Sequence, residues 1–156
     1  MKIKTLYILL LACLTSVTLN SCDQNDYLQY DENQAYVGFA YPSYGNDSIV
    51  YSFALHPNVE EDIVKVPMKL FGYAASQDRE VGVEVIESES TAKEGVDFVI
   101  EQKRMEANAY KDSLVVKIKK SAEVETKDLV VKLRLCGNGL FAAAPIDAES
   151  FRIILT

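Results

Sequence analysis

The sequence predicts an all-β protein: about seven to eight antiparallel strands in two packed sheets, after a signal peptide and a short linker. Three observations support this fold class. Apolar and polar residues alternate strictly in several segments, turn-forming residues separate these segments, and no segment has the periodicity of a long helix. A closed barrel is the alternative arrangement of the same strands.

The N-terminal segment has the composition of a secretory signal. Met1–Lys4 contains two lysines and is followed by the apolar run Leu6–Leu14. This run is too short to span a bilayer as a permanent helix, and it lacks the polar positions of an amphipathic helix. We therefore predict a signal peptide.

The end of this segment, Leu19-Asn20-Ser21-Cys22, resembles the lipobox of bacterial lipoproteins, although Asn20 departs mildly from the usual residue there. The resemblance implies that residues 1–21 are a lipoprotein signal peptide and that Cys22 is lipidated, which anchors the chain to a membrane. Cleavage at the alternative site, before Cys13, would leave an apolar tail on the mature chain, so Cys22 is favoured. Two or three acyl chains on one cysteine give a durable anchor, since each buried methylene contributes about 0.8 kcal/mol.

Residues 22–33 form the predicted linker, and residues 34–156 the predicted β-sandwich domain. The linker shows no periodicity and begins with the acidic, amide-rich run Asp23–Asp26. This composition indicates a hydrated, flexible tether behind the lipidated cysteine.

The charge balance excludes one class of partner. Lys2 and Lys4 leave with the signal, which contains no acidic residue, so the formal charge of −7 becomes −9 in the mature chain. Such an acidic chain is not expected to bind nucleic acid or an anionic lipid surface as its main partner. Cys136 then has no cysteine to pair with, and a packing role is favoured for it.

Six segments with a period of two define the best supported strands, with one face buried. Their predicted buried positions are Ile49, Tyr51, Phe53 and Leu55; Val64, Val66, Met68 and Leu70; Val81, Val83 and Val85; Leu114, Val116 and Ile118; Leu129, Val131, Leu133 and Leu135; and Phe151, Ile153 and Leu155. Residues 36–41 and 98–103 are weaker candidates. Because Pro67 has no N–H to donate, its strand is predicted to lie at a sheet edge or to carry a bulge.

The segment Ser90-Thr91-Ala92-Lys93-Glu94-Gly95-Val96-Asp97-Phe98, with the strand 114–118 and the segment 123–135, resembles the Calx-beta module. Thr91, Ala92, Gly95, Asp97 and Phe98 match the turn of that family, whose usual Ala-Gly before the next strand is Ala107-Asn108 here. The resemblance implies an immunoglobulin-like antiparallel β-sandwich.

The whole chain, with its signal and the segment Tyr36-Val37-Gly38-Phe39, is also similar to a family of uncharacterised Bacteroidetes envelope lipoproteins. This likeness implies a place in the cell envelope, at the outer membrane, on its periplasmic or surface face. Members of that family continue past the last strand seen here, so the resemblance implies a C-terminally shortened member.

Motifs for catalysis are missing from the sequence. His56 is the only histidine and precedes Pro57 in a predicted turn, which argues against a zinc site. The chain contains no Gly-x-Ser-x-Gly, phosphate loop or dinucleotide fingerprint. Carboxylate pairs such as Glu87 with Glu89 could flank a glycosidic bond but are more typical of a solvated surface. We therefore predict no enzymatic activity and no cofactor.

A calcium site is the alternative that the Calx-beta resemblance raises. Some modules of that family collect carboxylates at one end of the sandwich, because calcium needs six to eight oxygen ligands. The candidate ligands here are Glu94, Asp97, Glu123, Glu125 and Asp128. Asp97 could instead cap its own turn while the glutamates stay solvated.

Tyrosines are concentrated near the start of the domain, six of the nine lying between Tyr27 and Tyr51. Tyr36, Tyr41 and Tyr44 are the candidate ligand-binding residues, since exposed tyrosines can stack on sugar rings or anchor a protein partner. The alternative is ordinary strand packing. The predicted function is thus a lipid-anchored, non-enzymatic binding or accessory module for a glycan or an envelope protein, with a structural spacer or adhesion element, or a calcium-dependent module, as alternatives.

Overall fold

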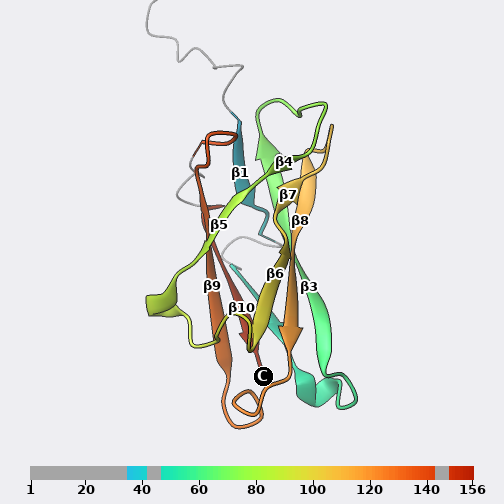
Figure 1. Cartoon of the computed structure of the whole chain (residues 1–156), viewed down its shortest axis with the longest axis vertical. Helices are drawn as coiled ribbons and strands as arrows, with labels where there is room; N and C mark the ends of the chain where they lie inside the picture. The colour runs from blue at the N-terminus through green and yellow to red at the C-terminus, as the bar shows by residue number, and fades with distance from the viewer. Residues whose placement is uncertain (1–34, 42–46, 143–147) are drawn as a thin grey trace, which may run out of the picture. The chain divides into compact units, whose positions relative to one another are not determined.

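The computed structural model describes residues 35–41, 47–142 and 148–156, and its strands are shown in Figure 1. The described residues all belong to one compact unit, Glu32–Thr156. Its strands are β1 (Tyr36–Phe39), β2 (Ser48–Tyr51), β3 (Glu61–Phe71), β4 (Arg79–Glu80), β5 (Gly82–Val85), β6 (Phe98–Gln102), β7 (Arg104–Met105), β8 (Lys111–Lys119), β9 (Leu129–Cys136) and β10 (Ser150–Leu155). Two 3₁₀ turns, η2 (Phe53–Leu55) and η3 (Glu87–Glu89), lie between them. No helix in these ranges is long and apolar enough to cross a membrane.

Eight of the ten described strands form two four-stranded sheets, in the orders β1-β3-β8-β6 and β2-β10-β9-β5, and β4 pairs with β7. Every pairing within the sheets is antiparallel except that of β2 with β10, which is parallel. The predicted all-β, immunoglobulin-like sandwich is therefore confirmed. The described strands number ten, more than the seven to eight predicted, because two continuous segments are each divided into two strands. Only Val81 separates β4 from β5, and only Lys103 separates β6 from β7.

The core lies between the inner faces of the two sheets and follows the predicted alternation. The predicted inward positions of β3, β8, β9 and β10 are all buried. The segment 48–55 departs from the prediction, because its strand ends at Tyr51 and the chain turns into η2. Phe53 still enters the core and its N–H donates to the Thr156 carbonyl at 2.7 Å, whereas Leu55 is 78% exposed. The prediction that Leu55 is buried was therefore wrong.

The strand that contains Pro67 is an interior strand, so its predicted position at a sheet edge was wrong. β3 pairs with β1 on one side and β8 on the other. The Pro67 carbonyl accepts a hydrogen bond from Ala40 N–H at 2.8 Å, so the main-chain groups of Pro67 face the β1 side. Because these groups face β1, the missing N–H of Pro67 breaks no hydrogen bond to β8. β1 itself ends at Phe39.

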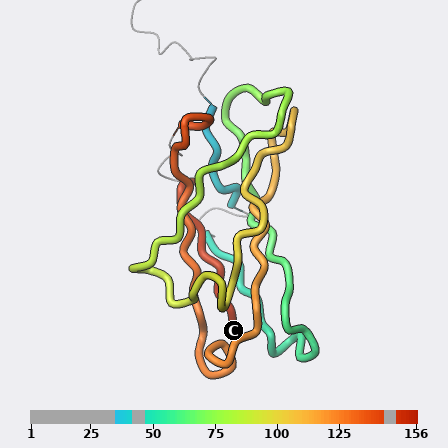
Figure 2. Tube along the Cα trace, viewed as in Figure 1, coloured from blue at the N-terminus to red at the C-terminus, as the bar shows by residue number. Residues whose placement is uncertain are grey.

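The two sheets are joined along one side by the short ladder of β4 with β7. Val81 N–H donates to the Lys103 carbonyl at 2.8 Å just beyond this ladder. From there β5 continues in one sheet and β6 in the other, and the two strands diverge (Figures 1 and 2). The sandwich is thus closed at the β4–β7 ladder and opens between β5 and β6.

Candidate functional site

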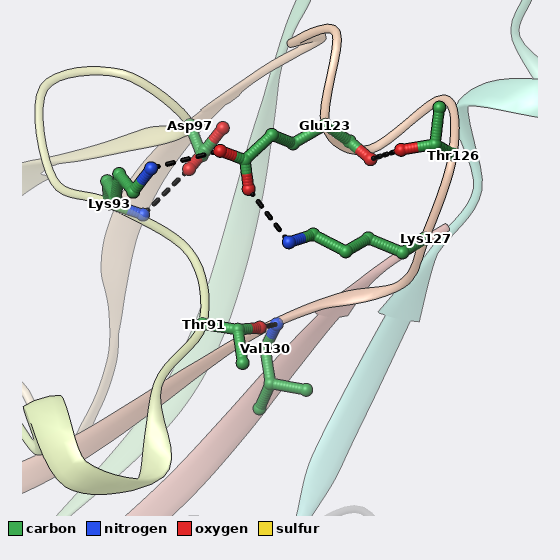
Figure 3. Close-up of polar contacts among 7 residues, drawn as sticks. All are labelled: Thr91, Lys93, Asp97, Glu123, Thr126, Lys127 and Val130. Atoms are coloured by element: carbon green, nitrogen blue, oxygen red, sulfur yellow. Dashed lines mark hydrogen bonds and ion pairs between the residues drawn. The ribbon is translucent and has the colours of Figure 1, made fainter.

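The turn that resembles the Calx-beta module is built around Asp97 (Figure 3). Asp97 is 1% exposed, and its Oδ2 accepts a hydrogen bond from Lys93 N–H at 2.7 Å. Gly95 has a φ of 83°, a left-handed conformation that glycine adopts without strain. Thr91 Oγ1 accepts from Val130 N–H at 2.8 Å and joins the turn to β9. The carboxylate of Asp97 therefore caps its own turn.

The Ala107-Asn108 departure from the family pattern has a structural explanation. Asn108 has a φ of 59°, the left-handed conformation in which glycine is usual and asparagine is tolerated. Asn108 therefore adopts a left-handed conformation at the position where the Calx-beta pattern has glycine.

Lysines neutralise two of the candidate calcium ligands. Glu123 lies 2.9 Å from Lys93 Nζ and 3.0 Å from Lys127 Nζ, and Glu125 lies 3.2 Å from Lys120 Nζ (distances from the carboxylate oxygens; Figure 3 shows Glu123). The hydrogen bond from Lys93, followed by that from Lys127, lowers the pKa of Glu123. The same Glu123 partner raises the pKa of Lys93. An ammonium group thus lies where a bound cation would approach Glu123.

The other candidate ligands add few oxygens. Glu94 and Asp128 are exposed, and the Oδ1 atom of buried Asp97 has no hydrogen-bond partner among the described residues. Within the described ranges, no three His, Cys, Asp or Glu side chains converge in a way that could hold a metal ion. The structure therefore brings Asp97 and Glu123 to neighbouring loops, but the side chains in this arrangement fit a calcium ion, with its six to eight oxygen ligands, poorly.

Calcium should not stabilise the protein. An ion that binds only the folded state at 100 times its Kd adds about 2.7 kcal/mol to the unfolding free energy. Because Lys93, Lys120 and Lys127 already pair with the glutamates, we expect no such gain at millimolar calcium in a thermal melt. A rise in Tm that matched sodium chloride does not reproduce, and that Asp97→Asn with Glu125→Gln abolishes, would instead identify a calcium-dependent module.

The structure describes two of the three predicted ligand-binding tyrosines. Tyr36 is half-buried and in register with Phe71. Tyr41 is also half-buried: its hydroxyl donates to the Ser150 carbonyl at 2.9 Å, and its ring stacks on Phe151 with centroids 6.1 Å apart. Tyr44 lies outside the described residues. These contacts give Tyr41 a packing role.

Tyr51, another member of this tyrosine group, forms a polar contact with a measurable pH signature. Its hydroxyl donates to Asp62 Oδ2 at 2.6 Å. Burial, with the hydrogen bond and charge of Asp62 adding to it, raises the pKa of Tyr51 to about 12. The hydrogen bond from Tyr51, followed by that from Ile63 N–H, lowers the pKa of Asp62.

Tyr51→Phe should therefore reduce the loss of unfolding free energy that accompanies a rise in pH at alkaline pH. A tyrosine whose pKa is raised by folding contributes stability that is complete below its ordinary pKa of 10.0 and is lost as the pH rises towards about 12. Urea unfolding between these pH values should show a steeper loss for the wild type than for Tyr51→Phe. The Asp62 contribution has the opposite sense, being lost as the pH falls below about 4, the ordinary aspartate pKa. If the unfolding free energies of the wild type and Tyr51→Phe changed equally with pH at both alkaline and acidic pH, the hydrogen bond between Tyr51 and Asp62 would be contradicted.

Two tyrosines that the sequence did not single out are the most exposed aromatic residues in the described ranges. Tyr73 is 55% exposed in the loop 72–78, and Tyr110 is 57% exposed at the end of the segment 106–110. The two segments lie at the same end of the sandwich (Figures 1 and 2). We call this part, Tyr73 and Tyr110 with their two segments, the tyrosine end.

Hydrogen bonds hold the tyrosine end together. Asn108 N–H donates to the Ala75 carbonyl at 2.7 Å, and Ala107 N–H donates to Asp78 Oδ1 at 2.9 Å. Arg79 donates to the Tyr73 carbonyl at 3.1 Å and lies 4.3 Å from the centroid of the Phe141 ring. The tyrosines are thus presented by loops that are fixed to the scaffold.

The sequence contained a signal for these two residues. Tyr73 follows Gly72, which has a φ of 120°, and Tyr110 closely follows the turn residue Asn108. Both residues lie outside the named strands, whereas Tyr36 and Tyr51 are strand residues. A position next to a turn was therefore a better indicator of an exposed tyrosine than the number of tyrosines in one segment.

Three solved structures with the same fold are described in different ways: one as carbohydrate-binding, one as a Calx domain and one as a protein of unknown function. A Bacteroides ovatus protein described as "a putative carbohydrate binding protein" matches with a TM-score of 0.52 and 9% identity over 78% of this chain and 36% of that protein. The apo form of the Calx CBD1 domain matches with a TM-score of 0.52 and 14% identity over 78% of this chain and 96% of that domain. A two-domain Bacteroides fragilis protein of unknown function matches with a TM-score of 0.52 and 15% identity over 81% of this chain and 46% of that protein. The chain thus spans less than half of either Bacteroides protein, and at these identities the likeness establishes the fold alone.

The sequence of residues 24–156 identifies the family of the chain. No curated protein matches the chain. Residues 24–156 match one sequence family over nearly the whole length that follows Cys22. The chain therefore belongs to the family described as a domain of unknown function, DUF4843.

Proposed function

We propose that this protein is a lipid-anchored, non-enzymatic binding module of the cell envelope, and that its tyrosine end binds a glycan. Cys22 carries the anchor in this proposal, at the outer membrane. The proposal combines the lipobox resemblance with the exposed aromatic residues of the sandwich.

The observation that carries the proposal is the exposure of Tyr73 and Tyr110 on segments tied to each other by hydrogen bonds. A sugar ring has apolar C–H faces and a polar edge, and a tyrosine offers an apolar ring with a hydroxyl at its tip. Carboxylate and guanidinium groups belong to the same end of the sandwich, with Arg104 3.2 Å from Asp78. Stacking on the rings and hydrogen bonds at the edge are the two interactions that a glycan needs.

The ionisable groups support a binding role over catalysis. His56 is exposed, and its ring stacks on Tyr51 with centroids 5.3 Å apart. Most carboxylates with a close partner face a lysine or arginine in an exposed ion pair. Such pairs contribute solubility and little stability, and they provide no poised acid or base.

The Bacteroides ovatus protein with the carbohydrate-binding description shares this fold, which makes glycans the first ligands to examine. The second matched Bacteroides protein, of unknown function, also shares this fold. Both likenesses support the proposal at the level of fold only.

A glycan array tests the proposal. The intact, detergent-solubilised protein should bind a restricted set of glycans, and Tyr73→Ala with Tyr110→Ala should lose that binding. Tyr41→Phe is the matched control, since it removes the hydroxyl of a half-buried tyrosine. An array on which the wild type binds no glycan would favour the structural spacer.

A further inference from the structure

A groove lies where β5 and β6 diverge. Two adjoining cavities, of 350 and 440 Å³, share the lining residues Val85, Glu87 and Glu94. Val83 and Ile100 also line the smaller cavity, from β5 and β6 respectively. We call this pair of cavities the edge groove. Its lining includes no residue of the two segments that form the tyrosine end, so binding in the edge groove does not require the proposed glycan binding.

The main chain of β5 faces the edge groove with groups that bond to no other described strand. β5 is the last strand of its sheet and pairs only with β9. Val81 N–H donates to the Lys103 carbonyl, away from β9, while Ile86 N–H donates to the carbonyl of Lys132 in β9. Because main-chain groups alternate sides along a strand, the N–H and C=O groups of Val83 and Val85 point away from β9 and into the groove.

The opposite wall has the same property. Lys119 N–H donates to the Asp97 carbonyl at 2.8 Å, so the alternate residue Val99 also faces β8. The main-chain groups of Ile100 then face away from β8, since β6 is the last strand of its sheet. The smaller cavity therefore has outward-facing main-chain groups of β5 on one side and of Ile100 on the other, just before the register shift between Ile100 and Gln102.

Apolar side chains form the floor of the groove. Val83, Val85 and Ile100 are half-buried and pack against the core. Val83 and Val85 are in register with the buried residues Leu135 and Leu133, so all four side chains lie on the inner face of the sheet. A strand added beside β5 would place every second side chain against this floor.

The rim carries uncompensated negative charge. Glu84, Lys103 and Lys93 line the cavities but already pair with Arg134, Glu80 and Glu123, respectively. Glu87 and Glu94 are exposed and form no ion pair with any described residue. Charge complementarity therefore selects a basic occupant.

We propose that the edge groove binds an extended, basic segment of a partner protein, which adds to β5 as a further strand of the second sheet. The segment hydrogen-bonds to the main chain of Val83 and Val85, as in other complexes formed by strand addition. It places alternate β-branched side chains over Val83, Val85 and Ile100. Its lysine or arginine side chains pair with Glu87 and Glu94.

The test begins with a phage-displayed library of about nine random residues, a length that spans a typical strand. The intact protein in detergent is the bait. Enriched peptides should alternate β-branched with polar residues and contain lysine or arginine. A synthetic copy of the best peptide should slow hydrogen exchange at the Val83 and Val85 amides by about tenfold or more.

Variants separate the two parts of the proposal. Glu87→Gln with Glu94→Gln should weaken the peptide about tenfold, whereas Glu60→Gln, at an exposed glutamate outside the groove, should not. Val83→Pro removes an N–H that faces the groove and leaves the ladder with β9 intact, so it should abolish binding while the unfolding transition persists. Tyr73→Ala with Tyr110→Ala should leave peptide binding unchanged, even if glycan binding fails.

Three results would overturn the proposal. One is a library that yields no enriched peptide, or only peptides without the alternation and the basic residues. Another is binding by Val83→Pro that equals that of the wild type. The third is protection of Val83 and Val85 that grows with protein concentration in the absence of peptide, which would assign the groove to a second copy of this chain.

Discussion

Cys22→Ala should release the protein from membranes or leave a full-length precursor. The reason is the loss of the proposed acylation site: each buried methylene of an acyl chain contributes about 0.8 kcal/mol, so removing two or three chains removes essentially all membrane affinity. Membrane fractionation and the mass of the mature chain measure the two effects. This is the largest change in behaviour that we expect from any single substitution.

Cys13→Ala is the matched control, because Cys13 is the other cysteine near the end of the apolar run. It should leave cleavage and fractionation unchanged. If Cys22→Ala yielded a membrane-bound chain of normal mature size, the protein would not be a lipoprotein anchored at that residue.

Leu133→Ala should have the largest effect on stability. Leu133 lies at the centre of β9, fully buried, in register with Phe151 on one side and Val85 on the other. Truncating a leucine in such a site removes its apolar contacts and leaves a cavity, at a cost of about 2–5 kcal/mol. Urea unfolding followed by circular dichroism measures the loss.

Leu55→Ala is the matched control, since it makes the same change at a leucine that is 78% exposed. Its expected cost is under about 0.5 kcal/mol. Equal losses for the two variants would mean that the inner face of β9 is assigned incorrectly.

The long strands could be predicted from the sequence because their environment is uniform. In β3, β8, β9 and β10 one face meets the opposite sheet along nearly the whole strand, so burial follows a period of two. The Asp97 turn was recognisable for a local reason, since its cap and its left-handed glycine lie within a few residues of each other.

Features that depend on distant partners were not predictable. Pro67 sits in an interior strand only because β1 ends before it reaches that position. Leu55 is exposed because η2 turns the chain after Tyr51, where Phe53 N–H donates to the carbonyl of Thr156, a residue far away in the sequence. The edge groove likewise needs β5 and β6 to diverge, and no local pattern encodes the separation of two strands in different sheets.

The candidate site shows the same division. The sequence predicted that acidic residues from two loops could meet at one end of the sandwich, and Asp97 and Glu123 do lie on neighbouring loops. It did not predict that Lys93 would pair with Glu123, because the two residues are far apart in the chain. The sequence places Tyr73 and Tyr110 next to turn residues, but their joint position depends on how two loops pack at one end of the sandwich.

The central claim, that the tyrosine end binds a glycan, is tested most directly by calorimetric titration of the best glycan from the array into the intact protein. If each ring contributes about 1 kcal/mol through stacking, Tyr73→Ala with Tyr110→Ala should raise Kd about 30-fold, and Tyr73→Phe with Tyr110→Phe should retain most of the affinity. An unchanged Kd in the double alanine variant would contradict the claim.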